Sequence, residues 1–478
     1  MAARSALAID LNLSNTDSIR AAAKTIADNI ITRYTNGSRV PGLFGPPYYF
    51  WESGLTWDSL INYQYLTGDT SYNDLIGEAL MHQIGPNSDF MPPNQTKTEG
   101  NDDQAYWALA AMTAAEWGFP EPRNSSSASG SNWAQLAQNV FDEQAARWDN
   151  GTCNGGLRWQ IFAFNNGYDY KNSMSTGAFF QLASRLAHYT GNQTYTEWAN
   201  AAYQWSFDVG LIANRSDTEN VASVYDGTDI AGNCTTVNHI QWTANIGQYI
   251  AGLAYLANTS RSLLSMDYVS LVSRANLTFA SLPNAAANGT LTETACAPNG
   301  NCNVDQLAFR AVLARALAQV QTLTQDTRLY EAENVTTPNG QTHPAANYSE
   351  PEWTIHERIS FILETSARGA ATQCSGGDDG TTCGNSWGNS TFDGSYGLGQ
   401  DLSALNIMLA NLPAGSPANS SVTRPARAPA SNGTTAVGGG NSTSGGAPPQ
   451  ATASGASGIP ASSFALLAGI AFAIAFCV

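Results

Sequence analysis

Two consecutive aspartates, Asp102 and Asp103, are the residues of this chain whose types and spacing point most directly to chemistry. They stand in the segment EGNDDQAYW, residues 99–107, at the expected start of a helix. Hydrolysis of an acetal needs one acid that protonates the leaving oxygen and one carboxylate that attacks the sugar or activates water. A gap of about 5 to 5.5 Å between the carboxyl groups gives retention of configuration, and a wider gap gives inversion. Adjacent residues favour the short gap.

Helix capping explains the same pair without any chemistry. Aspartates in a first turn offset unpaired backbone N–H groups and the positive end of the helix dipole. Neighbours inside a helix point about 100° apart and do not face one target. At an N-terminus the chain is only half helical, so that both side chains can still point into a cleft. The spacing leaves both interpretations open.

Aromatic and polar side chains gather in segments near expected helix ends, where they could bind a sugar. Sugar rings present apolar C–H faces that stack on aromatic rings, while acid, amide and amine groups bind the hydroxyls. Core packing is the alternative for each aromatic residue, and Lys171 is either a surface charge or a ligand to a sugar hydroxyl or a buried acid. The candidate substrate-binding residues are Trp51, Asp58, Trp159, Tyr170, Lys171, Asn172, Asp226, Trp242 and Asn245.

Metal and phosphate chemistry find no motif in the sequence. The five histidines are scattered, and none stands in an H-E-x-x-H or similar spacing. A phosphate-binding P-loop is also missing from the sequence. We therefore expect no metal and no cofactor.

The composition restricts the class of protein. The 478 residues include 21 Lys and Arg against 38 Asp and Glu, which gives a formal net charge of −17. No basic surface is available to neutralise phosphates, so we expect no nucleic-acid partner. Charged residues make up 12% of the chain, about half the usual 25% of globular domains. Acceptor sites of the form N-x-Ser/Thr recur from Asn12 to Asn441, which indicates a glycoprotein of the secretory route.

Six cysteines fit that route, since disulfides persist in oxidising compartments. Two pairs are favoured by their short separations, and the third pair is what remains: Cys296–Cys302, Cys374–Cys383 and Cys153–Cys234. Cys477 stands apart, in the apolar stretch that ends the chain. A zinc site is the rival interpretation, but no C-x-x-C spacing or nearby pair of histidines supports it.

Both ends of the chain resemble processing or anchoring segments. Residues 457–478 end in an apolar run that is shorter than the about 20 residues of a membrane span, as in a glycosylphosphatidylinositol (GPI) attachment signal. A tail-anchored membrane segment is the alternative. Residues 413–456 are rich in Ser, Thr, Pro and Gly, which predicts an unfolded stalk. Residues 1–9 contain an Ala-x-Ala-like site without an apolar h-region, so we interpret them as the remnant of a signal peptide or leader.

Between these ends, residues 10–412 form one compositionally even region with helical periodicity. The segment LTGDTSY, residues 66–72, is echoed by YTGNQTY, residues 189–195, as T-G-x-x-x-Y between two helices. Twelve helices in six hairpins would close into a toroid, so we expect an all-α domain with an (α/α)6 barrel; an open α-solenoid is the alternative. The expected helices cover residues 14–34, 53–67, 71–84, 102–117, 132–148, 172–190, 194–209, 240–257, 263–280, 304–323, 352–367 and 400–412.

Several segments, taken in order, carry a resemblance to a known family. They are WESGLTWDSL at 51–60, the Asp-Asp pair at 102–103, GGLRWQ at 155–160 and GYDYKN at 167–172. Together they resemble glycoside hydrolase family 76, the endo-α-1,6-mannanases, and specifically its fungal GPI-anchored cell-wall branch. The resemblance covers roughly residues 10–412. The segment WTANIG, residues 242–247, follows the bacterial members only loosely.

The resemblance implies the (α/α)6 fold and a retaining mechanism on α-1,6-mannosidic bonds, with Asp102 as the nucleophile and Asp103 as the general acid/base. For the fungal branch it implies transglycosylation, from an α-1,6-mannoside donor on GPI-anchored glycoproteins to a β-glucan acceptor of the cell wall. We also expect a monomer at the extracellular face of the plasma membrane and in the wall, held to the membrane through a GPI anchor only. The rival hypotheses are a non-catalytic cell-wall-glycan-binding protein and a structural mannoprotein.

Overall fold

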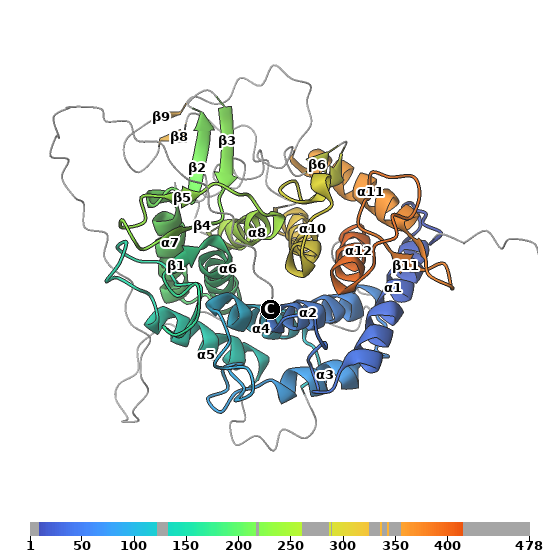
Figure 1. Ribbon diagram of the computed structural model, residues 1–478, viewed down its shortest axis with the longest axis horizontal. Coiled ribbons are helices and arrows are strands. Elements are labelled where there is room, and N and C mark those ends of the chain that lie inside the picture. The colour runs from blue at the N-terminus through green and yellow to red at the C-terminus, as the bar shows by residue number, and fades with distance from the viewer. Residues whose placement is uncertain are drawn as a thin grey trace, which may run out of the picture.

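The structure, a computed structural model, describes residues 9–121, 132–216, 219–260, 286–287, 289–324, 335–336, 342–343 and 355–413. Eleven α-helices lie within these ranges and form two concentric rings (Figure 1). The inner ring consists of α2 (Phe50–Thr67), α4 (Asn101–Trp117), α6 (Ser173–Thr190), α8 (Thr243–Ser260), α10 (Val304–Thr324) and α12 (Leu398–Ala410). The outer ring contains α1 (Thr16–Gly37), α3 (Asn73–His82), α5 (Trp133–Ala146), α7 (Gln193–Asp208) and α11 (Ile355–Gln373).

Each inner helix packs against the next one, and α12 packs against α2, so the inner ring closes (Figure 1). This closure confirms the expected toroid and contradicts the open α-solenoid. The expected helix at 263–280 lies outside the described residues, as do the leader up to residue 8, nearly all of the stalk and the expected GPI signal. No helix among the described residues is long and apolar enough to cross a membrane.

The pattern of burial separates the two rings. In α1 the buried side chains recur at helical spacing on one face, for example at Ile19, Ala23, Ile26 and Ile30. In α4, by contrast, every residue from Gln104 to Ala115 is buried. A helix that is covered on all sides has to be apolar or small on all sides, which the alanine-rich sequence of α4 satisfies.

The repeated T-G-x-x-x-Y segment marks two equivalent helix ends. Gly68 follows α2 with a φ of 75°, and Gly191 follows α6 with a φ of 72°. Glycine is favoured at this left-handed position because it has no Cβ. Both glycines therefore let an inner helix turn back into the next outer helix.

Short antiparallel strands lie between the helices in the chain order. At the start of α6, a three-stranded sheet joins β1 (Tyr170–Asn172), β4 (Gly227–Asp229) and β5 (Val237–Asn238) in that order. The two-stranded pairs are β2 (Ile212–Ser216) with β3 (Glu219–Val224), β6 (Ala286–Ala287) with β7 (Thr290–Leu291), β8 (Val335–Thr336) with β9 (Thr342–His343), and β10 (Cys374–Gly376) with β11 (Thr382–Cys383). A 3-10 helix spans Ala297–Asn299.

The six cysteines form three disulfides, Cys153–Cys234, Cys296–Cys302 and Cys374–Cys383. These are the pairs that the sequence separations predicted. The described residues contain no group of three or more His, Cys, Asp or Glu side chains that could hold a metal ion.

Candidate active site

The first turns of the inner helices α2, α4 and α10 meet at one end of the barrel. Trp51 in the first turn of α2 makes two of the contacts that join them. Its backbone N–H donates to Oδ1 of Asp103 in α4 at 3.2 Å. Its indole Nε1–H donates to Oδ1 of Asp305 in α10 at 2.7 Å. Two carboxyl groups from two helices thus contact one tryptophan, and Asp102 lies next to one of them, Asp103.

Asp103 caps α4, and its carboxyl group still lies beside that of Asp102. Its Oδ2 accepts the backbone N–H of Gly100, the N-cap residue of α4, at 2.8 Å, which is the expected capping contact. Its backbone N–H donates to Oδ1 of Asp102 at 3.0 Å. Because the pair is only half-buried, capping does not remove the two carboxyl groups from the barrel end.

The surroundings shift the pKa values of the two carboxyl groups by different amounts. Burial raises the pKa of Asp103 to about 6, while the N–H groups of Gly100 and Trp51 limit the rise. Burial and the charge of Asp103 raise the pKa of Asp102 well above its ordinary value. Two buried carboxyl groups this close repel each other when both are ionised, which favours a pair that keeps a proton.

Two further acids near the pair were missed from the sequence. Burial raises the pKa of Asp305, whose carboxylate accepts the Trp51 indole N–H. Burial raises the pKa of Glu52 to about 8, and nearby Asp305 and Asp103 add to the rise. Asp305 has the same signal as Asp102, an acid in the first turn of an expected helix. Glu52 stands three residues after Tyr49 and accepts its backbone N–H at 2.9 Å, as a helix cap does.

Aromatic rings from three inner helices pack together beside the acids. The ring of Trp51 lies 5.0 Å from that of Tyr106 and 5.9 Å from that of Phe309, between centroids. Trp242, directly before α8, lies 5.6 Å from Phe309. These contacts bring the candidates Trp51 and Trp242 together across α10.

Asp226 joins two other candidates. Its Oδ2 accepts the Tyr170 hydroxyl at 2.6 Å, and its Oδ1 accepts the Trp242 indole N–H at 2.9 Å. Asp226 therefore orients two aromatic side chains, and burial raises the pKa of its own carboxyl group. Trp159 leaves 38% of its surface exposed and pairs through its backbone N–H with the Tyr170 carbonyl at 2.7 Å.

Asn245 and Asn172 differ in whether their side chains have hydrogen-bond partners among the described residues. The Asn245 side chain is fully buried, and neither its Oδ1 nor its Nδ2 has a hydrogen-bond partner among the described residues. One helical turn further along α8, Gln248 donates to the Tyr106 hydroxyl at 3.0 Å, so Asn245 shares a face with a residue that contacts α4. Asn172 caps α6 by accepting the Ser175 N–H at 3.0 Å.

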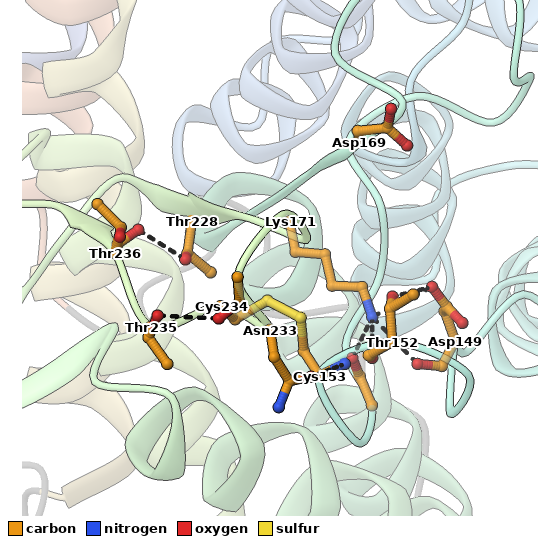
Figure 2. Close-up of a disulfide and its surroundings, with 12 residues drawn as sticks. Asp149, Thr152, Cys153, Asp169, Lys171, Thr228, Asn233, Cys234, Thr235 and Thr236 are labelled. Atoms are coloured by element: carbon orange, nitrogen blue, oxygen red, sulfur yellow. Dashed lines mark hydrogen bonds and ion pairs between the residues drawn. A yellow bond between two sulfur atoms is a disulfide. The ribbon is translucent and has the colours of Figure 1, made fainter.

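Two candidates are engaged elsewhere. Asp58 lies deeper in the ring, where its Oδ1 is 3.1 Å from Arg315 Nη2 in a buried ion pair. Lys171 is fully buried, and its ammonium group donates to the backbone carbonyls of Asp149, Thr152 and Gly155 (Figure 2). An ammonium group has three N–H donors, so none remains for a sugar. We therefore withdraw Lys171 from the candidate substrate ligands.

Comparison with known proteins identifies the family of the chain. The model of glycosyl hydrolase family 76 matches residues 18–337 and 350–424. The chain is 42% identical over 404 residues to mannan endo-1,6-alpha-mannosidase DCW1 of Saccharomyces cerevisiae, covering 84% of this chain and 81% of that protein.

Solved structures agree with the barrel. The crystal structure of Dfg5 from Chaetomium thermophilum in complex with glucosamine has a TM-score of 0.71 at 34% identity, covering 84% of this chain and 92% of that one. An inactive variant of the alpha-1,6-mannanase GH76A of Salegentibacter sp., with two consecutive aspartates replaced by asparagine and alpha-1,6-mannotriose bound, has a TM-score of 0.57 at 16% identity, covering 82% and 99%. With the family match across most of the sequence, the chain belongs to glycosyl hydrolase family 76 and is a glycoside hydrolase with an (α/α)6 barrel.

Proposed function

We propose that this enzyme cleaves α-1,6-mannosidic bonds of fungal cell-wall glycans with retention of configuration, and that Asp102 and Asp103 carry out the reaction. The observation that carries the proposal is the pair of adjacent carboxyl groups in the first turn of α4, which have raised pKa values and lie half-buried beside the aromatic residues Trp51 and Tyr106. The substrate follows the names of the related proteins, which include an endo-1,6-alpha-mannosidase at 42% identity.

In the proposed reaction, Asp103 protonates the leaving oxygen while the carboxylate of Asp102 attacks the anomeric carbon. This step breaks the glycosidic bond and forms a glycosyl ester on Asp102. Asp103 then takes the proton of an incoming hydroxyl, whose oxygen attacks the same carbon and releases Asp102 as a carboxylate. Attack from opposite faces in the two steps restores the original configuration.

The proposed roles require an ionised nucleophile and a protonated acid when substrate is bound. Burial raises the pKa of both carboxyl groups, so the bound substrate has to favour the ionised form of Asp102. A leaving oxygen that accepts a hydrogen bond from Asp103 stabilises the protonated form of that residue. The positive charge that develops on the sugar, together with the N-terminus of α4, favours the ionised form of Asp102.

We further propose that the incoming hydroxyl belongs to a sugar. In this proposal the donor is an α-1,6-mannoside of a GPI-anchored glycoprotein, and the acceptor is a β-glucan of the wall. The enzyme itself would be a monomer, delivered by the secretory pathway and held at the extracellular face of the membrane through a GPI anchor attached in place of residues 457–478. The resemblance of the sequence to the fungal wall branch, its acceptor sites for N-glycans and its disulfides support this location.

The test uses the secreted enzyme with an α-1,6-mannose-containing GPI-glycan oligosaccharide, with and without a β-glucan oligosaccharide, and identifies products by mass spectrometry. We expect a chimeric product from the wild type. Asp102→Asn and Asp103→Asn should each lose at least about 10²-fold in rate while remaining folded. The matched control is Asp74→Asn, which changes an exposed aspartate in the first turn of α3 and should leave the rate unchanged.

The products distinguish the functions. Shortened mannosides without a chimera would indicate a hydrolase and contradict transfer. Binding without any product would contradict the enzyme and favour a wall-glycan-binding protein. Wild-type rates in either aspartate variant would contradict the assignment of the pair.

A further inference from the structure

Lys171 is a cation enclosed by backbone oxygen atoms. It lies in the middle of β1 and is fully buried. Its Nζ donates to the carbonyl oxygens of Asp149 at 3.0 Å, Thr152 at 2.7 Å and Gly155 at 2.5 Å. Nζ also lies 3.3 Å from Oδ2 of Asp149. Figure 2 shows the side chain reaching from the strand into the loop that carries Asp149, Thr152 and Cys153.

The loop that forms this enclosure, residues 149–155, depends on the cation for its shape. Without the ammonium group between them, the carbonyl groups of Asp149 and Gly155 would lose their donor, and that of Thr152 would keep only the Gly155 N–H at 3.4 Å. Cys153 and Asn154 both have a φ of 55°, in the left-handed region that non-glycine residues adopt at a cost. The disulfide from Cys153 to Cys234 holds the loop to the segment after β4 (Figure 2). We call these three carbonyl groups the carbonyl cage.

Backbone contacts connect the strand that carries Lys171 to the start of α4. The backbones of Lys171 and Arg158 form an antiparallel bridge. The next residue, Trp159, accepts the backbone N–H of Asn101 at 2.8 Å on its carbonyl oxygen. The Asn101 side chain also donates to the Arg158 carbonyl at 2.9 Å. Asn101 is the first residue of α4 and immediately precedes the two catalytic aspartates.

A second connection runs through side chains. Asp149, which contributes to the carbonyl cage, lies 2.8 Å from Arg158 Nη2 through its Oδ2. Loop 149–155 therefore contacts the side chain of Arg158, while β1 pairs with its backbone. Lys171 links the loop and the strand, since its backbone is in β1 and its ammonium group is in the loop.

We propose that Lys171 is a positioning residue, whose ammonium group in the carbonyl cage fixes segment 158–160 and, through it, the start of α4 that carries the catalytic pair. Lys171 contacts no substrate in this role. Its loss displaces the aspartates, and a displacement of about 1 Å can cost about 10²-fold in rate. The activity readout rests on the proposed function, whereas the conformational readout below does not.

The experiment compares Lys171→Met, which keeps an apolar side chain of similar length, with Lys171→Ala, which leaves space for an added amine. The matched control is Lys97→Ala, at an exposed lysine. We expect both Lys171 variants to lose about 10- to 100-fold in kcat with KM changed less than about twofold. Hydrogen exchange measured by mass spectrometry should become faster in peptides covering residues 99–103 and 156–160, and should stay unchanged in the control.

Chemical rescue separates a missing cation from a general defect. Propylammonium chloride should raise the kcat of Lys171→Ala at least about fivefold, since it supplies an ammonium group to the carbonyl cage. It should also slow the hydrogen exchange of residues 99–103. Sodium chloride at the same ionic strength should restore less, and Lys171→Met should not respond because its side chain fills the space.

Three results would overturn the proposal. A kcat within twofold of wild type in both variants would remove the positioning role. A rise in KM with unchanged kcat and unchanged exchange would make Lys171 a substrate ligand instead. Failure of both variants to fold at every amine concentration would reduce Lys171 to a residue that only stabilises the fold. If the wild type lacks mannosidase activity, the exchange of residues 99–103 still decides between these outcomes.

Discussion

Asp102 and Asp103 differ in what surrounds each carboxyl group. Asp103 accepts two backbone N–H groups, from Gly100 and Trp51, which favour its ionised form. Asp102 accepts one, from its neighbour. These contacts favour the ionised form of Asp103 more than that of Asp102, although the resemblance assigns the nucleophile to Asp102. Kinetics on substrates that need no acid can separate the two roles.

We predict that alanine variants of the pair respond differently to azide with a 2,4-dinitrophenyl α-1,6-mannobioside. Its leaving group departs without protonation, so Asp103→Ala should still form the glycosyl-enzyme and give the α-azide, with retention. Asp102→Ala lacks the nucleophile, so azide should attack directly and give the β-azide, with inversion. Nuclear magnetic resonance of the anomeric proton measures both. The opposite pattern would exchange the roles of the two residues, and no azide product from either variant would contradict the retaining pair.

At the scale of elements, the position of the pair depends on how closely the chain before α4 approaches it. A Cβ built on Gly100 would lie 2.3 Å from Oδ1 of Asp102 and 3.0 Å from the Trp159 carbonyl oxygen. The backbone of Gly100 itself is extended, with a φ of −86°, so alanine is not strained there by its dihedral angles. Any effect of a methyl group must therefore come from displacing these atoms.

We predict that Gly100→Ala lowers kcat by at least about 10-fold while the melting temperature falls only a few degrees. The reason is that the methyl group forces the Asp102 carboxylate aside. Gly77 in α3 provides the control, because a Cβ there meets nothing within 4 Å. Gly77→Ala should leave kcat unchanged and stabilise the helix by about 0.5–1 kcal/mol. Equal activity of the two variants would contradict the close approach at Gly100.

The sequence could predict those parts of the site that depend on one helix at a time. The helices on either side of residue 102 can be predicted from apolar periodicity and from caps. The candidate role of the Asp-Asp pair can be predicted from its position in the first turn of an expected helix. The contacts of Asp305 with Trp51 could not be predicted, because they join residues 254 positions apart and depend on closure of the ring. The partners of Lys171 could not be predicted for a similar reason. Its carbonyl partners leave no trace in the sequence, since every residue has a carbonyl group.

At the scale of the whole molecule, burial in the barrel raises the pKa values of several acids. Burial raises the pKa of Glu52 to about 8, of Glu99 to about 10, of Glu293 to about 7 and of Asp401 to about 6. A carboxyl group with a raised pKa binds its proton more tightly in the folded state than in the unfolded state. Its contribution to stability is complete below the unfolded pKa, near 4, and is lost as the pH rises through the folded pKa.

We predict that the enzyme is more stable at pH 5 than at pH 8, with a melting temperature at least about 3 °C higher, which corresponds to roughly 1 kcal/mol. The lowered pKa of Lys171, about 8, has the opposite sign but acts only above pH 8, where its unfolded form still binds a proton. The net charge of −17 also favours acid pH through reduced repulsion, so the scans are made in 0.5 M sodium chloride, which screens surface charges and not buried ones. Glu52→Gln, which cannot ionise, should reduce the difference between the two pH values. A melting temperature that is higher at pH 8, or a Glu52→Gln variant with an unchanged pH difference, would mean that burial does not raise the pKa values of these acids.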